Sequence, residues 1–204
     1  MARILLVRHG LVDLNEIRFL GRTDLPLNET GVKQAEQLRD RLAREKIDAI
    51  YASPLRRANA TAAIIASRHK TPVIACDDLC ECNFGAIEGL TYEEIKQRYP
   101  ALAEELRVRK TGAFPGGETL EQLNERVQAF LKRLEKHKPE ETVLVVAHGG
   151  PVRLIICNLL GLGLEHWVQL QVAHASLSIV DTYPEMSILS LLNDTSHLNT
   201  TVKD

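Results

Sequence analysis

Residues 3–10 have the sequence RILLVRHG, an uninterrupted apolar run that ends in Arg-His-Gly. A short continuous run of leucine and β-branched side chains is typical of a strand covered on both faces of a sheet. Residues 142–149, TVLVVAHG, repeat the pattern and again end in His-Gly. We therefore predict two inner strands of a largely parallel sheet, each followed directly by a histidine.

Outward from these two strands, short apolar runs alternate with longer segments that carry apolar side chains at helical spacing. Helices are expected over 32–42, with Thr30 as the N-cap, and over 120–134. This alternation predicts an α/β protein with a largely parallel sheet. The expected strands are residues 4–7, 47–52, 73–76, 142–147, 177–181 and 188–192.

Residues 86–117 depart from this alternation. They contain no convincing strand, carry paired charges and are broken by Pro100 and Pro115. A segment of this kind is expected to form a helical cap over one edge of the sheet. We therefore predict one domain, 1–204, with a small helical cap at about 86–117.

Composition excludes several classes of protein. Lys and Arg number 25 and Asp and Glu 27, a formal net charge of −2, which excludes a nucleic-acid binder that relies on bulk positive charge. The longest mostly apolar stretch, 154–164, is too short to span a membrane, and the first residues do not resemble a signal peptide, so we expect a cytoplasmic protein. Four cysteines lack zinc-site spacing and are expected to be reduced thiols: Cys76, Cys80, Cys82 and Cys157.

Two histidines mark the expected binding edge of the sheet. Ligands of parallel α/β sheets bind beyond the carboxyl ends of the strands, and His9 and His148 each follow such an end. Ser53 ends a third strand, and the helix after it opens with arginines, of which Arg57 is one. Together with Arg8 these side chains form a cationic cluster whose natural ligand is a phosphate.

Phosphoryl transfer requires a nucleophile, stabilisation of charge and a proton for the leaving group. A neutral imidazole can attack phosphorus, whereas the arginines stay protonated and cannot. The best candidate for the acid is Glu81 in LCECNFG, because its apolar neighbours would favour the neutral carboxyl. A surface carboxylate in a loop is an equally good interpretation of the same residue.

Six sequence blocks point to a known family. In order within residues 4–150 they are LVRHG, NEIRFLGRTDLPLNETGVKQA, SPLRRANATA, LCECNFGAIEG, FPGGETL and VVAHGG. They resemble the histidine phosphatase superfamily, in the branch of the cofactor-dependent phosphoglycerate mutases and the alpha-ribazole phosphatases. The resemblance implies a three-layer α/β/α sandwich with a mostly parallel mixed sheet, and an enzyme that needs no metal or other cofactor.

The resemblance also implies roles for individual residues. His9 is expected to be the nucleophile that becomes phosphohistidine, and Glu81 the proton donor that later activates water. Arg8 and Arg57 are expected to clamp the phosphate, with His148 as a further member of the pocket. Additional contacts with phosphate or substrate are expected from Asn15, Gly21, Thr23 and Gly149.

Three positions need a choice or depart from the family pattern. Arg57 is preferred to Arg56 because the family's catalytic arginine directly precedes an alanine. Leu11 and Val12 follow His-Gly, where the family usually has a polar pair, and Ile87 replaces a common tryptophan. We expect activity to survive these changes with altered substrate contacts.

The short segment between Glu81 and Pro115 favours a phosphatase over a phosphoglycerate mutase, since mutases of the family carry a longer insertion there. The expected substrate is a small phosphomonoester such as alpha-ribazole 5′-phosphate. Phosphoserine, phosphosugars and 3-phosphoglycerate stay open. Basic residues in the cap either meet an anionic substrate or form a solvated helix face: Arg107, Arg109 and Lys110.

Three other classes of function stay open. The pocket can belong to a phospho-ligand binding module without turnover, to a metal site built from both histidines and Glu81, or to a serine hydrolase that uses Ser53. The last lacks the G-x-S-x-G motif. Oligomeric state is undecided, and a homodimer stays open, because three apolar side chains fit a core or an interface: Trp167, Leu170 and Val172.

Overall fold

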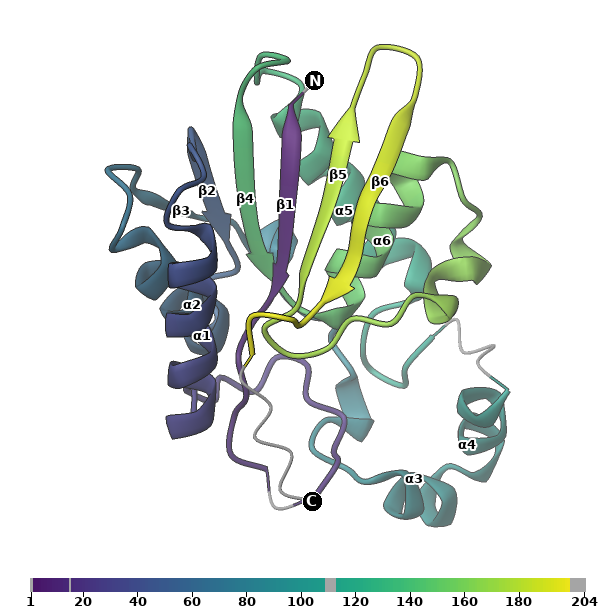
Figure 1. Cartoon of the computed structure of the whole chain (residues 1–204). Helices are drawn as coiled ribbons and strands as arrows, with labels where there is room; N and C mark the ends of the chain where they lie inside the picture. Colours follow the sequence, from purple (N-terminus) through teal and green to yellow (C-terminus); the bar gives the residue numbers. More distant parts are fainter. Residues whose placement is uncertain (1, 15, 109–112, 199–204) are drawn as a thin grey trace.

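A computed structural model describes residues 2–14, 16–108 and 113–198, and within these ranges it contains a six-stranded sheet with helices on both faces (Figure 1). The strands are β1 (Arg3–Arg8), β2 (Ala49–Ala52), β3 (Val73–Ala75), β4 (Thr142–Ala147), β5 (Leu177–Thr182) and β6 (Ser187–Asp194). They lie where the sequence predicts them, with ends shifted by one or two residues.

The sheet has the strand order β3-β2-β4-β1-β5-β6. The four strands from β3 to β1 are parallel, whereas β5 and β6 run antiparallel to their neighbours. The predicted mostly parallel mixed sheet is confirmed. The two strands that end in histidine, β1 and β4, are adjacent at its centre.

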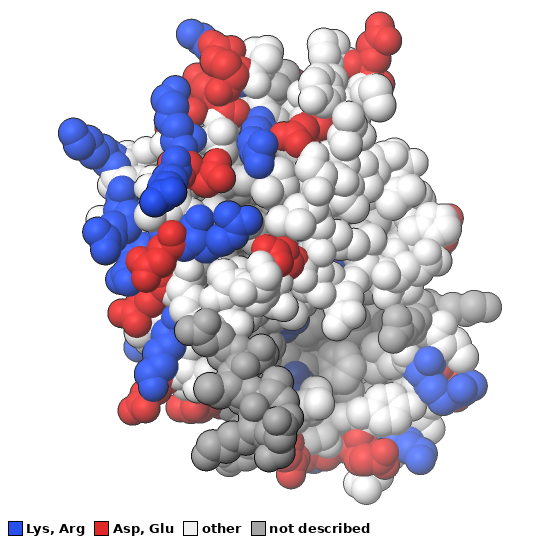
Figure 2. All heavy atoms as spheres, viewed as in Figure 1, with Lys and Arg blue, Asp and Glu red and all other residues white. Residues whose placement is uncertain are grey.

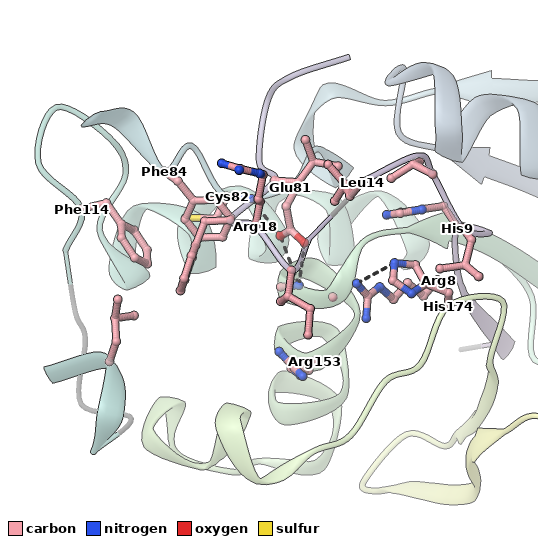
Figure 3. Close-up of a pocket in the computed structure, with 18 of the residues that line it drawn as sticks. Arg8, His9, Leu14, Arg18, Glu81, Cys82, Phe84, Phe114, Arg153 and His174 are labelled. Atoms are coloured by element: carbon pink, nitrogen blue, oxygen red, sulfur yellow. Dashed lines mark hydrogen bonds between the residues drawn. The ribbon is translucent and has the colours of Figure 1, made fainter. Parts of the chain in front are cut away.

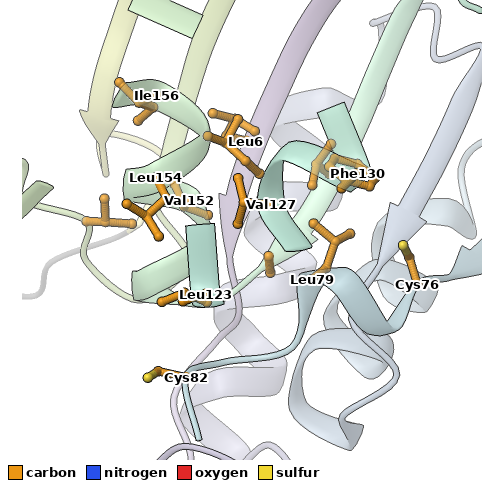
Figure 4. Packing of buried hydrophobic residues seen from close by; sticks show 14 of the residues in the cluster. Leu6, Cys76, Leu79, Cys82, Leu123, Val127, Phe130, Val152, Leu154 and Ile156 are labelled. Carbon is orange, nitrogen blue, oxygen red and sulfur yellow. The ribbon is translucent and has the colours of Figure 1, made fainter. Parts of the chain in front are cut away.

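Helices cover both faces of the sheet, because strand side chains alternate between the two faces. Leu5 and Val7 of β1 pack in one core with α1 (Glu29–Leu42) and α2 (Arg56–Ala66). Leu6, between these two residues, points to the opposite face and packs in the other core. Figure 4 shows it near Val127 of α5 (Leu120–Leu134) and Val152 of α6 (Gly149–Leu160). The predicted three-layer α/β/α sandwich is therefore confirmed.

The start of α1 corrects one prediction. Asn28, and not Thr30, is the N-cap, since the Asn28 side chain accepts a hydrogen bond from the backbone N–H of Gly31 at 2.7 Å. Asparagine caps helices at least as well as threonine, and the N–H of Asn28 is itself bound to the carbonyl of Leu11. The helix thus begins one residue before Thr30, which lies in its first turn.

Two short helices, α3 (Tyr92–Arg98) and α4 (Pro100–Arg107), lie beyond the carboxyl ends of the parallel strands (Figure 1). Thr91 and Glu94 form a capping box at α3, and Pro100 starts α4, where its missing N–H costs nothing. The segment expected to form a cap is therefore helical, while the single-domain boundary 1–204 stays a prediction. The remaining helices are short 3-10 turns: η1 (Asp77–Leu79), η2 (Gly85–Ile87) and η3 (Leu164–Gln169).

Of the three apolar side chains of uncertain role, only Val172 is fully part of the core, and oligomeric state stays undecided. Val172 is buried, and Trp167 and Leu170 are partly buried against the same cluster as Leu6. The four cysteines are free thiols and all are buried. Among the described residues, no helix is long and apolar enough to cross a membrane.

Charged side chains of both signs gather over α1 and α2, at the left of Figure 2. The area over β5 and β6 carries few of them in this view. It includes the edge strand β6, on which Ile188 and Leu192 are half exposed.

Candidate active site

The carboxyl ends of β1, β4 and β2 bring His9, His148 and Ser53 to one edge of the sheet. The N–H groups of His9 and Ser53 continue the strand ladders onto β4, donating to the carbonyls of Ala147 and Val146. The rings of His9 and His148 lie edge to face with centroids 5.0 Å apart. The two His-Gly pairs therefore meet as their strand-end positions predict.

The ring of His9 has a defined tautomer. Its Nδ1 atom lies 2.7 Å from the carbonyl oxygen of Gly10, which can only accept, so the proton is on Nδ1. The Nε2 atom keeps its lone pair and accepts a hydrogen bond from Nε of Arg57 at 3.3 Å. Burial, followed by the charges of Arg8 and Arg57, lowers the pKa of His9 well below its usual value. His9 is therefore neutral near pH 7.

Arg57 is fully buried beside His9, whereas Arg56 is exposed and binds Asp24 through its backbone N–H. The guanidinium of Arg57 donates to the carbonyl oxygens of Thr23 and Gly21 at 2.8 and 2.7 Å. Gly21 and Thr23 thus contact the arginine through their backbone and are not among the residues that line the cavity. Their expected contact with phosphate stays a prediction.

Arg8 is held by backbone and side-chain acceptors. Its Nη1 donates to the carbonyl of Val172 at 2.7 Å, and its Nη2 donates to Nε2 of His174 at 3.0 Å. Its Nε is buried and has no hydrogen-bond partner among the described residues. Burial lowers the pKa of Arg8 to about 10, so the group stays charged at neutral pH. Within the described part of the chain, neither Arg8 nor Arg57 lies within ion-pair distance of a carboxylate.

His174 was not foreseen from the sequence. It completes the cluster, since its ring centroid lies 5.3 Å from that of His9. It precedes β5, whose first residues adjoin the end of β1 because the two strands are antiparallel. The N–H of Ala175 donates to the carbonyls of Arg8 and His9, and Ala175 has a φ of 53°, a strained conformation for alanine. The strand expected at 177–181 was an available signal for this segment, but it does not say which strand it would pair with.

The folded protein should lose stability on acidification through His174. Burial, and then the charge of Arg8, lowers its pKa from about 6.5 to about 4. The unfolded chain therefore binds more protons between these values, so stability present above pH 6.5 is lost as the pH falls toward 4. Denaturant unfolding at pH 7 and pH 5 should show wild type losing about 2 kcal/mol more than His174→Asn. An equal loss of stability in the two proteins would contradict this account.

His148 is fully buried and is oriented by Ser53, whose Oγ lies 2.8 Å from Nε2 of the ring. Its Nδ1 is buried without a hydrogen-bond partner among the described residues, an arrangement that costs free energy unless a ligand atom supplies one. Ser53 itself is fully buried, and its Oγ contacts His148 and the thiol of Cys80.

Glu81 is a buried member of the cavity and not a surface carboxylate. Only 9% of it is exposed, and its carboxylate accepts the N–H of Cys82 at 2.9 Å and that of Gly150, at the start of α6, at 3.2 Å. The expected environment was apolar, and the structure adds these two donors. A Cβ atom on Gly149 would lie 3.7 Å from Oε2 of Glu81 and 3.9 Å from Cζ of Arg8, so these charged groups converge there.

Gly150→Ala should displace the Glu81 carboxylate, because the added Cβ would lie only 2.5 Å from Oε1. We expect turnover to fall by about a hundredfold or more, as for other small displacements of catalytic groups. Phosphate release assays and a thermal melt should be compared. Normal turnover in a variant with wild-type melting would show that the position of Glu81 is unimportant.

Arg126, on α5, fixes the segment that carries Glu81, and it was not foreseen from the sequence. Its guanidinium donates to the carbonyls of Asp78, Cys80 and Glu81 at 2.6–2.9 Å. It also forms a two-point ion pair with Glu118, of the block FPGGETL, at 2.8 and 3.0 Å. Glu118 in turn accepts the N–H of Asn83. The two blocks LCECNFG and FPGGETL are therefore joined behind the carboxylate.

A cavity of about 750 Å³ opens from this cluster (Figure 3). Arg8, His9 and Glu81 line it, as do Gly149 and the apolar pair Leu11 and Val12. Asn15, whose contact with phosphate is predicted, lies outside the described residues, as do Arg109 and Lys110. Of the other positions discussed above, Arg107 forms an exposed ion pair with Glu104 away from the cavity, and Ile87 is buried in the core.

A metal site is not formed by these side chains. Within the described residues, no group of three or more His, Cys, Asp or Glu is placed to hold a metal ion. His9 and His148 instead bind Gly10, Arg57 and Ser53 through their ring nitrogens.

Comparison with known proteins decides the family. The family model described as histidine phosphatase superfamily (branch 1) matches residues 4–195. The chain belongs to the histidine phosphatase superfamily. Phosphoserine phosphatase 1 of Hydrogenobacter thermophilus is a relative that is 35% identical, over 97% of this chain and 95% of its own length.

Solved structures with the names of phosphatases share the fold. A putative alpha-ribazole-5′-P phosphatase from Escherichia coli is 27% identical, with a TM-score of 0.87 over 95% of this chain and 98% of that one. A mycobacterial glucosyl-3-phosphoglycerate phosphatase is also 27% identical, with a TM-score of 0.86 over 95% and 99%. The relative and the two solved structures are named as phosphatases of three different substrates. The comparison therefore supports a phosphatase but does not identify its substrate.

Proposed function

We propose that this chain is a phosphomonoesterase that works through a phosphohistidine at His9 and needs no metal ion. One observation carries the proposal: a buried, neutral His9 with its proton fixed on Nδ1 directs the lone pair of Nε2 at the Arg57 guanidinium. This is the tautomer and charge state that a nucleophile at phosphorus requires.

Nε2 of His9 attacks the phosphorus atom, the N–P bond forms, and the bond to the ester oxygen breaks. Arg8 and Arg57 stabilise the charge on the phosphoryl oxygens, which is the contribution a metal ion makes in other phosphatases. Glu81 donates a proton to the leaving oxygen. Its carboxylate then takes a proton from water, which attacks the phosphohistidine and releases inorganic phosphate. The buried Nε of Arg8 and Nδ1 of His148 offer further hydrogen-bonding positions in the cluster.

For the substrate, we propose a small phosphorylated metabolite such as alpha-ribazole 5′-phosphate. The structural neighbour from Escherichia coli with the corresponding name supports this choice. The relative named phosphoserine phosphatase 1 and the neighbour named for glucosyl-3-phosphoglycerate keep those two substrates as competitors.

A release assay with p-nitrophenyl phosphate in the presence of a chelator tests the proposal. We expect turnover to continue, and protein quenched in alkaline denaturant to carry an alkali-stable, acid-labile phosphate on His9. Inhibition by the chelator, reversed by added metal, would refute the metal-independent mechanism. In the same experiment, conversion of phosphoglycerate isomers faster than phosphate release would identify a mutase, and absence of both activities a binding module.

A further inference from the structure

We infer that the phosphomonoester hydrolysed here carries a large, mainly apolar leaving group, seated on one wall of the cavity. This apolar wall consists of Leu14, Ile17, Phe19, Phe84, Phe114 and Trp167, all of which line the cavity. The inference rests on the proposed function, because it assumes that the phosphate occupies the cationic end.

The two ends of the cavity differ in chemistry. Figure 3 shows His9, Arg8 and His174 at one end and the phenyl rings of Phe84 and Phe114 at the other, with Glu81 between them. A phosphate held at the cationic end therefore directs its ester substituent past Glu81, which has to reach the ester oxygen, toward the phenyl rings.

The aromatic part of the wall is preformed. Phe19 and Phe84 pack edge to face with centroids 5.5 Å apart, and Phe84 and Phe114 do so at 4.8 Å. Each ring thus restricts the next, and Phe114 is only 9% exposed. A rigid apolar surface binds an apolar group without a cost for ordering side chains, which favours such a substituent.

The rim of the wall includes two apolar side chains that are open to solvent, beside the ion pair of Arg18 and Glu16. Ile17 is 94% exposed and Leu14 is 38% exposed, and both border the same cavity. A single exposed apolar side chain is common on protein surfaces and does not indicate a binding site. Two that continue a buried aromatic surface extend the area that a ligand can cover.

The charged groups beside the wall already have partners. Arg18 donates to Glu94 and Glu16 and to the carbonyl of Gly89. Arg153 stacks over the ring of Trp167 with its Cζ 5.9 Å from the centroid and donates to a backbone carbonyl. The ammonium and carboxylate of a small zwitterion such as phosphoserine would have to compete with these contacts.

Size supports the same conclusion. A cavity of about 750 Å³ lies in the range of about 300–1,000 Å³ that holds drug-sized ligands. Phosphoserine and phosphoglycerate would leave the apolar wall in contact with water, whereas a bicyclic aromatic or long alkyl group would cover it.

Matched pairs of substrates test the inference with the intact protein. Hexyl phosphate against ethyl phosphate, and 1-naphthyl phosphate against phenyl phosphate, differ in apolar size but little in the acidity of the leaving alcohol. Burial of a methylene is worth about fourfold in kcat/KM, so we expect at least about a tenfold preference for the larger member of each pair. Equal values, or higher kcat/KM for phosphoserine or 3-phosphoglycerate, would overturn the inference. Failure to hydrolyse any ester would instead reject the proposed function.

Two variants connect the preference to the wall. Ile17→Ser removes apolar surface from a side chain that supports nothing else, and Phe114→Leu shortens the aromatic part. We expect each to lower the hexyl-to-ethyl ratio of kcat/KM by about threefold or more. Met186→Ser, at a side chain that is 60% exposed in the turn between β5 and β6, is the matched control and should keep the wild-type ratio. An unchanged ratio in both wall variants would place the apolar group elsewhere.

Discussion

His9→Ala should abolish phosphate release, lowering kcat by about four orders of magnitude or more, as loss of a catalytic nucleophile does in other hydrolases. The reason lies in the geometry: among the described side chains, His9 alone presents an unprotonated ring nitrogen to the Arg57 guanidinium in this cluster. Rates with p-nitrophenyl phosphate and phosphate labelling of protein quenched in alkaline denaturant measure the effect.

A histidine elsewhere in the fold supplies the control for this result. His69 follows the end of α2 and is not among the residues that line the cavity, so His69→Ala should keep turnover and labelling. His9 is buried, so removal of its imidazole can also change the stability of the fold. The free energy of unfolding should therefore be measured on the same samples. Labelling that persists in the folded His9→Ala variant would show that another residue carries the phosphoryl group.

Glu81→Gln should produce the second largest effect, and its size should depend on the leaving group. The amide keeps the shape of the carboxyl group but can no longer donate or accept the proton. For alkyl phosphates, whose alcohols leave only with a proton, we expect kcat/KM to fall by about 10²–10⁴-fold. For p-nitrophenyl phosphate the first step should be affected far less, because nitrophenolate leaves as an anion.

The same variant should accumulate phosphohistidine. Glu81 is also expected to activate the water, so the second step slows for every substrate, and p-nitrophenol should appear in a burst that matches the enzyme concentration. Glu121→Gln, at an exposed carboxylate in the first turn of α5, is the matched control and should turn over normally. A uniform loss across leaving groups without a burst would contradict the acid–base role.

The strand-end histidines show what could be predicted from the sequence. His9 and His148 follow continuous apolar strands, and parallel strands align their carboxyl ends, so their meeting required only the fold class. The position of Arg57 near these histidines could be predicted for the same reason, because the helix that carries it starts just beyond the carboxyl end of β2. The choice between Arg56 and Arg57 came from the resemblance, since helical spacing alone does not say which of two adjacent side chains turns inward.

His174 and Arg126 could not be placed, for two different physical reasons. His174 reaches the site through an antiparallel strand whose partner is far away in the sequence, and periodicity does not report strand order. Arg126 lies on the polar border of an amphipathic helix, where an arginine is usually solvated, and only the loop carbonyls of Cys80 and Glu81 give it a role. Thr30 was expected as the cap because threonine favours that position, but asparagine favours it at least as strongly, and Asn28 forms the cap.

The central position of β1 has a consequence for biosynthesis. This strand is synthesised before both of its partners, β4 and β5, which follow far along the chain. Arg8 and His9 are therefore made before His148 and His174 can join them. Until then the apolar side chains of β1 have no neighbouring strands to pair with. Nascent chains that stop short of β5 should have no hydrolytic capacity, and they should depend on chaperones that cover exposed strands.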